Sequence, residues 1–218
     1  MTDTTIAHRE RLALCDLFDE VGPDAATLCE GWATRDLAAH IILRETRPDL
    51  AAGMFVPFLQ GRLESAQDSL AATDFAALVE KVRTGPPFWN PMSIPVIDEL
   101  MNLVEFVVHH EDVLRGEVMT GGQPGPRREV DPAIDKSVWG ALKRMAPLMF
   151  RRSEVPVSLT VPGRGTIEAK AGPEPVLISG APIELLLTAY GRGRAAAVSY
   201  DGPPAAIETL KKTKLGLA

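Results

Sequence analysis

Residues 105–112 read Glu105-Phe106-Val107-Val108-His109-His110-Glu111-Asp112, and the rest of the chain can be organised around this stretch. Glu105 and His109 are four residues apart, so on a helix they lie one turn apart on the same face, where both can reach one metal ion. Asp112 follows His109 by three residues, close enough to support a ligand. Because Glu-x-x-x-His also occurs on solvated helices, a metal site needs a third ligand. His40 is the candidate.

The residues around this stretch, 96–115, predict a helix with two different faces. The apolar face carries Val96, Leu100, Leu103, Val104, Val107 and Leu114. The opposite face carries Asp98, Asn102, Glu105, His109 and Asp112. This polar stripe has two interpretations: a solvated surface, or the lining of a cavity between helices. We interpret His110, which falls nearer the apolar side, as a packed histidine, and His8 has no partner in the sequence.

Composition predicts an ordinary globular protein of 218 residues, with 45% hydrophobic and 24% charged residues. The net charge is −6 and no basic patch is visible, which argues against nucleic acid as a partner. The sequence contains neither an 18-residue apolar run nor a signal-like N-terminus, so we expect a cytoplasmic protein without a membrane partner. Cys15 and Cys29 are too few for a disulfide framework, and we expect both to be reduced and neither to be a ligand.

The hydrophobic periodicity is helical up to residue 115 and alternating after residue 154. Helices are expected at 6–20, 35–46, 49–83 (interrupted near Pro57 and Gly61, with a cap at Thr73 or Asp74), 96–115, 132–151, 182–190 and 204–214. Thr34 is expected to cap the second helix, with Asp36 in its first turn. Strands are expected at 155–161, 166–170, 176–178 and 196–200.

A cluster of glycines and prolines between residues 116 and 126 separates the two patterns and predicts a domain boundary. We therefore expect an α+β fold, with a helical metal-binding domain at 1–124 and a small α/β domain at 125–218. The helix at 132–151 could pack with either domain.

His40, Glu105 and His109 form a ligand set that is typical of catalytic zinc. The same residue types also suit non-haem iron. Three protein ligands leave at least one position for water or substrate, which distinguishes a catalytic metal from a structural one. Neither cysteine lies in the two helices that carry these ligands, which argues against a thiolate-rich structural site.

Three segments resemble the mycothiol-dependent maleylpyruvate isomerase family. Residues 29–40, Cys-Glu-Gly-Trp-Ala-Thr-Arg-Asp-Leu-Ala-Ala-His, are similar to the family segment that bears the first metal histidine, and residues 105–112 to its Glu-x-x-x-His-x-x-Asp segment. Residues 178–187, continuing into Tyr-Gly-Arg at 190–192, are similar to its C-terminal domain. One departure is at Ala33-Thr34, where the family more often has its capping threonine one position earlier.

The resemblance implies a DinB-like four-helix bundle followed by a sterol-carrier-like domain, with a divalent metal, zinc above all, held by His40, Glu105 and His109. It also implies mycothiol as thiol co-substrate, in S-transfer to a small electrophile or in its cis–trans isomerisation. Arg192 is the candidate for steadying an anionic substrate, although a surface turn is its simpler interpretation. Two alternatives stay open: a non-catalytic ligand-binding protein stapled by the metal, or another metalloenzyme such as a hydrolase or iron oxygenase. A monomer or homodimer is expected.

Overall fold

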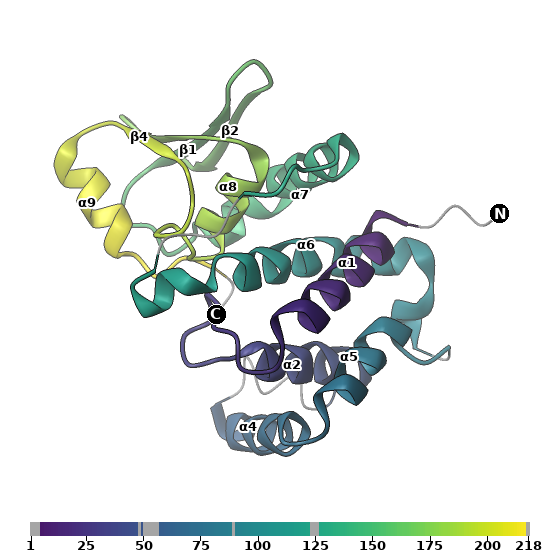
Figure 1. Cartoon of the computed structure of the whole chain (residues 1–218). Helices are drawn as coiled ribbons and strands as arrows, with labels where there is room; N and C mark the ends of the chain where they lie inside the picture. The colour runs from purple at the N-terminus through teal and green to yellow at the C-terminus, as the bar shows by residue number, and fades with distance from the viewer. Residues whose placement is uncertain (1–4, 48, 50–56, 89, 123–126, 217–218) are drawn as a thin grey trace. The chain divides into compact units, whose positions relative to one another are not determined.

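The computed structural model describes residues 5–47, 49, 57–88, 90–122 and 127–216, without the side chains of residues 57–60, 92, 96, 100 and 101 (Figure 1). The described chain contains both helices and a four-stranded mixed sheet, which confirms the α+β class. It divides into two compact units, Met1–Arg127 and Arg128–Ala218. The expected boundary after residue 124 lies outside the described residues. None of the described helices is long and apolar enough to cross a membrane.

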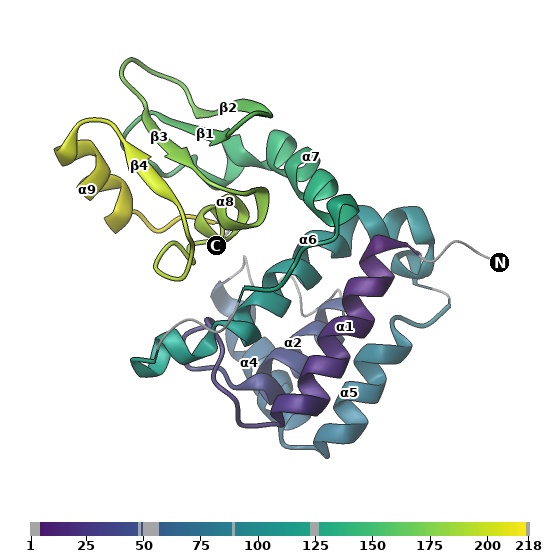
Figure 2. The same ribbon diagram turned by 45° about the horizontal axis from the view of Figure 1, so that its top comes forward.

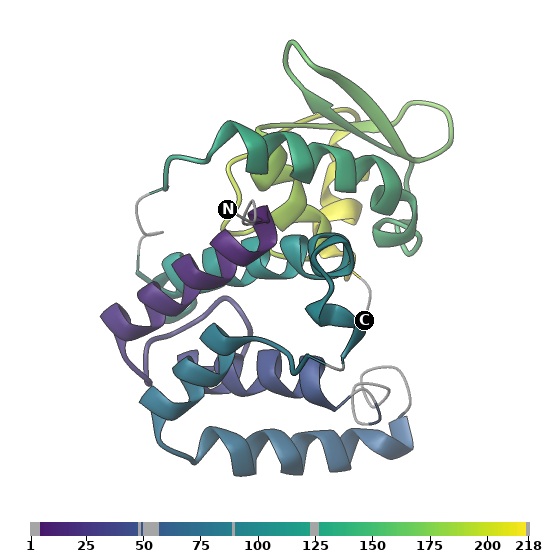
Figure 3. The same ribbon diagram turned by 90° about the vertical axis from the view of Figure 1, so that its right-hand side faces the viewer.

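The N-terminal unit is helical. Its helices are α1 (Ile6–Val21), α2 (Thr34–Thr46), α4 (Pro57–Ala71), α5 (Phe75–Thr84) and α6 (Pro95–Leu114), with short 3-10 turns η2 (Pro91–Ser93) and η3 (Gly116–Thr120) (Figure 3). Helix α1 packs against α6 and α5, and α2 packs against α4 and α5. The core between them is apolar; its fully buried members include Leu14, Phe18, Leu37, Leu78 and Phe106.

The start of α2 differs from the prediction. Ala33 occupies the N-cap position and Thr34 is the first helical residue, so the expectation that Thr34 caps the helix is wrong. The Thr34 hydroxyl instead donates to the carbonyl of Gly22, which buries it. Asp36 accepts the backbone N–H of Ala33 at 2.9 Å and so stabilises the first turn.

The long helical region predicted at 49–83 contains α4 and α5. Pro57 is the first residue of α4, where its missing N–H has no helical partner to lose. The helix runs through Gly61 without a break, so the interruption predicted there is wrong. Asp74 caps α5 by accepting the N–H of Ala77 at 2.9 Å. Residues 50–56 lie outside the described part of the chain.

The polar stripe of α6 faces the interior. Asp98, Asn102, His109 and Asp112 are 8%, 0%, 6% and 0% exposed, so the solvated interpretation is wrong. Arg11 of α1 and Glu45 of α2 meet beside the stripe, with two guanidinium–carboxylate contacts of 2.8 and 2.5 Å. The Asn102 amide donates to Asp98 at 2.7 Å and reaches Glu45 at 3.4 Å. These contacts compensate charges that would otherwise be buried alone.

The C-terminal unit is built from α7 (Pro132–Met149), β1 (Val157–Val161), β2 (Gly165–Lys170), β3 (Val176–Ser179), α8 (Pro182–Ala189), β4 (Ser199–Asp201) and α9 (Pro204–Lys212) (Figure 2). The strand order is β2-β1-β3-β4. β1 pairs antiparallel with β2 and parallel with β3, and β3 pairs antiparallel with β4. Helix α7 packs against α8 and β2, so it belongs to this unit.

The last strand begins later than predicted. The sequence pattern placed it at 196–200, whereas β4 spans Ser199–Asp201. The Ala197 N–H donates to the carboxylate of Glu184 at 2.7 Å instead of joining the sheet. Glu184 is 4% exposed, so its carboxylate needs this kind of partner. Because of this side-chain contact Ala197 does not pair in the sheet, and β4 begins two residues later, at Ser199.

Gly116 is required by close backbone approach. A Cβ at this residue would lie 1.8 Å from the carbonyl oxygen of Ala26 and 2.9 Å from Cα of Thr27. A Cβ at Gly61, within α4, would meet nothing within 4 Å. Replacement of glycine by alanine is therefore expected to destabilise the fold at residue 116 and to stabilise it at residue 61.

We predict that Gly116→Ala lowers the free energy of unfolding by at least about 2 kcal/mol, because backbone atoms cannot move aside for the methyl group. Gly61→Ala should raise it by about 0.5–1 kcal/mol through helix propensity. Urea unfolding followed by circular dichroism measures both variants. Equal stability of Gly116→Ala and the unmodified protein would contradict the close approach of residues 26 and 116.

Candidate metal centre

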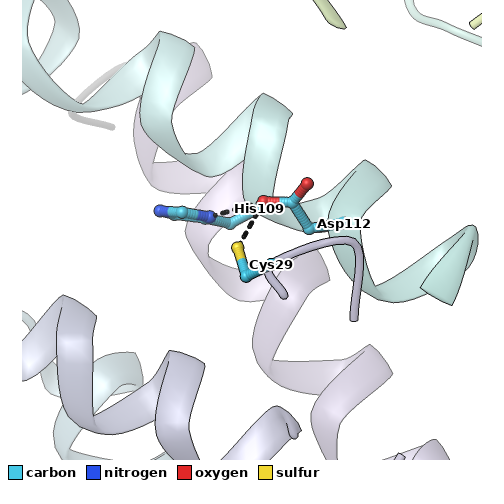
Figure 4. Close-up of side chains that lie close together, drawn as sticks. All are labelled: Cys29, His109 and Asp112. Atoms are coloured by element: carbon cyan, nitrogen blue, oxygen red, sulfur yellow. Dashed lines mark hydrogen bonds and ion pairs between the residues drawn. The ribbon is translucent and has the colours of Figure 1, made fainter. Parts of the chain in front are cut away.

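His109 is the central residue of the candidate site. It lies on α6 and is 6% exposed. Its Nδ1 lies 3.0 Å from Oδ2 of Asp112 (Figure 4). Its Nε2 lies 3.4 Å from Oε2 of Glu105. Both carboxylates come from the same helix, three residues after and four residues before the imidazole. Helical spacing alone therefore places an acidic group at each ring nitrogen.

His40 joins these residues from α2. The ring centroids of His40 and His109 are 5.4 Å apart, and the rings meet edge to face at 80°. One ligand atom from each of His40, Glu105 and His109 lies within 4.8 Å of the other two. The structure thus brings together all three residues that the sequence proposed as ligands.

The loop before α2 fixes the approach of His40. Its Trp32 ring lies 5.2 Å from the His40 ring, centroid to centroid. The Thr27 hydroxyl donates to the Trp32 carbonyl at 2.8 Å, and the Leu28 N–H donates to the carbonyl of Asp112 at 2.9 Å. The loop is therefore tied to the C-terminal end of α6, the helix that supplies the other two candidate ligands.

Cys29 is a member of the site that sequence analysis missed. Its Sγ lies 3.3 Å from Oδ2 of Asp112 (Figure 4). Cys29, His109 and Asp112 form a second group whose ligand atoms lie within 4.8 Å of one another. No spacing pattern links residues 29 and 112, which are 83 positions apart, so only the fold reveals this contact.

Hydrogen bonding distinguishes the two groups. On the Nδ1 side of His109, Asp112 already accepts from the imidazole and from the Cys29 thiol. On the other side, Nε2 is buried and has no hydrogen-bond partner in the described chain. Zinc bonds of about 2.0–2.1 Å in a tetrahedron place two ligand atoms roughly 3.4 Å apart. The separation of His109 Nε2 and Glu105 Oε2 is 3.4 Å, so the group with His40 fits a metal better.

The charges around Glu105 keep it ionised. Burial by itself would raise its pKa, but the adjacent His109 imidazole, with the charges of Arg44 and His40, lowers the pKa to about 2. Arg44 lies on α2, one turn after His40, with its Nε 3.8 Å from Glu105 Oε2. Its Nη1 donates to Oδ1 of Asn102. Arg44 therefore connects Glu105 to Asn102 within the polar stripe.

The protonation of His109 follows from the same contacts. Burial would lower its pKa, but the hydrogen bond with Asp112 and the contacts with Cys29 and the Glu105 carboxylate outweigh it and hold the pKa well above the usual value. The carboxylates on both sides of the ring therefore favour the protonated imidazole when no metal is bound. A metal can bind Nε2 only when that nitrogen carries no proton, so metal binding competes with protonation.

Two further residues singled out from the sequence, Arg192 and His110, are not members of either ligand group. Arg192 lies in the C-terminal unit, in the turn after α8, and its Nη1 donates to the Tyr190 carbonyl at 2.7 Å. Its catalytic role stays a prediction. His110 is 8% exposed, with Nδ1 3.5 Å from a carboxylate oxygen of Glu10, in keeping with a packed histidine.

Comparison with known proteins found no significant match among protein-family models, curated proteins or solved structures. The family resemblance therefore rests on the residues at 29–40, 105–112 and 178–192 alone. Family membership stays a prediction, and any function must be argued from the site.

Asp112→Asn tests how His109 is oriented. The amide cannot hold the Nδ1 proton as the carboxylate does, so zinc affinity should fall about 10–100-fold. Cys29→Ser keeps Asp112 in place and should change the affinity less than about threefold, because Cys29 is outside the better-fitting group. Competition with a chromophoric chelator measures both. A larger loss for Cys29→Ser than for Asp112→Asn would assign the metal to the other group.

The two thiols should differ in reactivity. Cys15 is 0% exposed, and burial raises its pKa to about 12, whereas Cys29 is half-buried. Iodoacetamide at pH 8 should label only Cys29 in the folded protein and both cysteines in urea, as read by peptide mass mapping. The raised pKa of Cys15 also makes the free energy of unfolding depend on pH. The stabilisation from the protonated thiol is fully present below about pH 9, the pKa of this thiol in the unfolded chain. It is lost as the pH rises towards about 12, its pKa in the folded protein. Labelling of Cys15 at pH 8 without unfolding would contradict its burial.

Proposed function

We propose that the chain is a metal-dependent, thiol-using enzyme of the cytoplasm, with a DinB-like N-terminal bundle. In this proposal His40, Glu105 and His109 hold one divalent cation, zinc being the best fit. The thiol is mycothiol, on the resemblance described above, and the reaction is S-transfer to a small electrophile or its cis–trans isomerisation. The observation that carries the proposal is the buried Nε2 of His109, which lacks a hydrogen-bond partner in the described chain and faces an ionised carboxylate.

The donor set favours zinc for chemical reasons. Two imidazoles and one carboxylate are a known set for catalytic zinc, and they leave at least one coordination position for another ligand. A zinc ion bound there would lower the pKa of a thiol at that position, so that the nucleophilic thiolate is available at neutral pH.

The protein's own residues prepare the site in distinct ways. Asp112 accepts the Nδ1 proton of His109 and so directs the lone pair of Nε2 towards Glu105. Arg44 holds Glu105 in its charged form from 3.8 Å. Trp32 packs against His40 and limits the movement of that ring. We keep Arg192 as the candidate for binding an anionic substrate group.

Both proposed reactions begin with the thiolate as nucleophile. In transfer, a carbon–sulfur bond forms while the leaving group departs with its electron pair. In isomerisation, the thiolate adds to a polarised double bond, the new single bond rotates, and expulsion of the thiolate restores the double bond. Neither reaction needs an oxidant or a reductant.

Replacing each proposed ligand by alanine tests the metal site. His40→Ala, Glu105→Ala and His109→Ala should each weaken zinc binding by at least the 10–100-fold typical of changes to groups that only support a ligand. His8→Ala is the control, since His8 lies outside the site, and should keep full occupancy. Metal content per chain after dialysis against a weak chelator measures the effect. Full occupancy in His40→Ala would rule out the proposed ligand set.

The thiol is tested separately with the cobalt-substituted protein. Added mycothiol should produce a sulfur-to-cobalt charge-transfer band in the absorption spectrum. Glutathione is added to a second sample, so that the responses to two different thiols can be compared. A band that needs no added thiol would indicate Cys29 as a ligand. A cobalt form whose spectrum does not change with any thiol would contradict thiol use and favour a hydrolase or a metal that only staples the bundle.

A further inference from the structure

A cavity of about 430 Å³ is lined by residues of the C-terminal unit. It is formed by the C-terminal end of α8, the glycine-rich turn that follows, β4, and the end of α9 with the residues after it. This volume falls within the range of small-molecule sites. Its described lining residues all belong to this unit.

The charged groups of this cavity are cationic. Arg194 and Lys211 line it, and no Asp or Glu is among its described lining residues. The Arg194 guanidinium makes no hydrogen bond or ion pair with any residue that the structure describes. Lys211 is partly committed, with Nζ 3.5 Å from Glu208 and 5.3 Å from the centroid of the Tyr200 ring. Arg194 is exposed, so its guanidinium can exchange water for an incoming anion without breaking a contact within the described chain.

A hydroxyl group adds a donor beside these cations. Tyr200 lines the cavity, and its hydroxyl has no hydrogen-bond partner in the described chain. Burial raises its pKa, so the phenol keeps its proton and can donate. Gly193 leaves room at this point, since a Cβ there would lie 3.6 Å from the Tyr200 hydroxyl.

The rest of the wall includes apolar residues. Leu210, which is 2% exposed, and Leu215 line the cavity together with the methyl-bearing Thr188. A bare inorganic anion would leave this surface without contacts. We propose that the cavity binds a small organic carboxylate, with its carboxylate at Arg194, Lys211 and the Tyr200 hydroxyl, and its apolar body against Leu210 and Leu215.

A purely structural role for the cations is the main competing explanation. Helix α8 ends at this cavity, and cations often pair with the free carbonyls of a helix C-terminus. However, the Tyr190 carbonyl at the end of α8 accepts from Arg192 at 2.7 Å, not from Arg194. Arg194 therefore remains available to a ligand. The proposal is independent of the metal centre and does not rest on it.

Isothermal titration of the full chain with octanoate tests the proposal, with octanol and octylamine as matched neutral and cationic compounds and inorganic phosphate as a bare anion. Octanoate should bind at least about tenfold more tightly than the other three, because it alone satisfies both the cations and the apolar wall. Equal affinity for octanoate and octanol, or no binding of octanoate, would overturn the proposal.

Two variants locate the binding in this cavity. Arg194→Gln should weaken octanoate binding about tenfold or more, and Gly193→Val should weaken it by placing a side chain beside the Tyr200 hydroxyl. Lys212→Gln removes a neighbouring exposed cation that does not line the cavity and should leave the affinity unchanged. Circular dichroism checks that each variant is folded. Unchanged octanoate affinity in both cavity variants would overturn the assignment.

Discussion

The burial of the polar face of α6 is the constraint on which the N-terminal unit depends. A helix that carries carboxylates, an amide and an imidazole into the interior can be stable only if neighbouring elements bring partners. Each does so: α1 supplies Arg11, α2 supplies Glu45, Arg44 and His40, and the loop before α2 supplies Cys29. These contacts need specific positions, so they restrict how the helices can slide past one another.

The same contacts that stabilise the interior also shape the candidate metal centre. Arg11 pairs with Glu45, the Asn102 amide reaches Glu45, and Arg44 connects Asn102 to Glu105. A candidate ligand is therefore the end of a buried network that begins on α1. His109 lies beside Glu105, and its opposite ring nitrogen is held by Asp112. Its Nε2 is buried and has no hydrogen-bond partner among the described residues.

Local patterns in the sequence predicted much of this arrangement. Helical spacing placed Glu105, His109 and Asp112 on one face of α6, and the bounds of α1 and α6 were predicted to within a residue. Contacts between distant residues could not be predicted in this way. The approach of Cys29 to Asp112 has no trace in local spacing. Likewise, the Thr34 cap and the start of β4 were mispredicted, because the partners that decide them, Gly22 and Glu184, lie 12 and 13 residues away from the groups they bind.

X-ray absorption at the zinc edge of the zinc-loaded protein tests the central claim most directly. The account predicts a shell of nitrogen and oxygen atoms at about 2.0–2.1 Å, with the outer scattering of two imidazole rings and no sulfur. Added thiol should then introduce one sulfur near 2.3 Å. A sulfur atom already present without added thiol, or the scattering of a single imidazole, would contradict coordination by His40, Glu105 and His109.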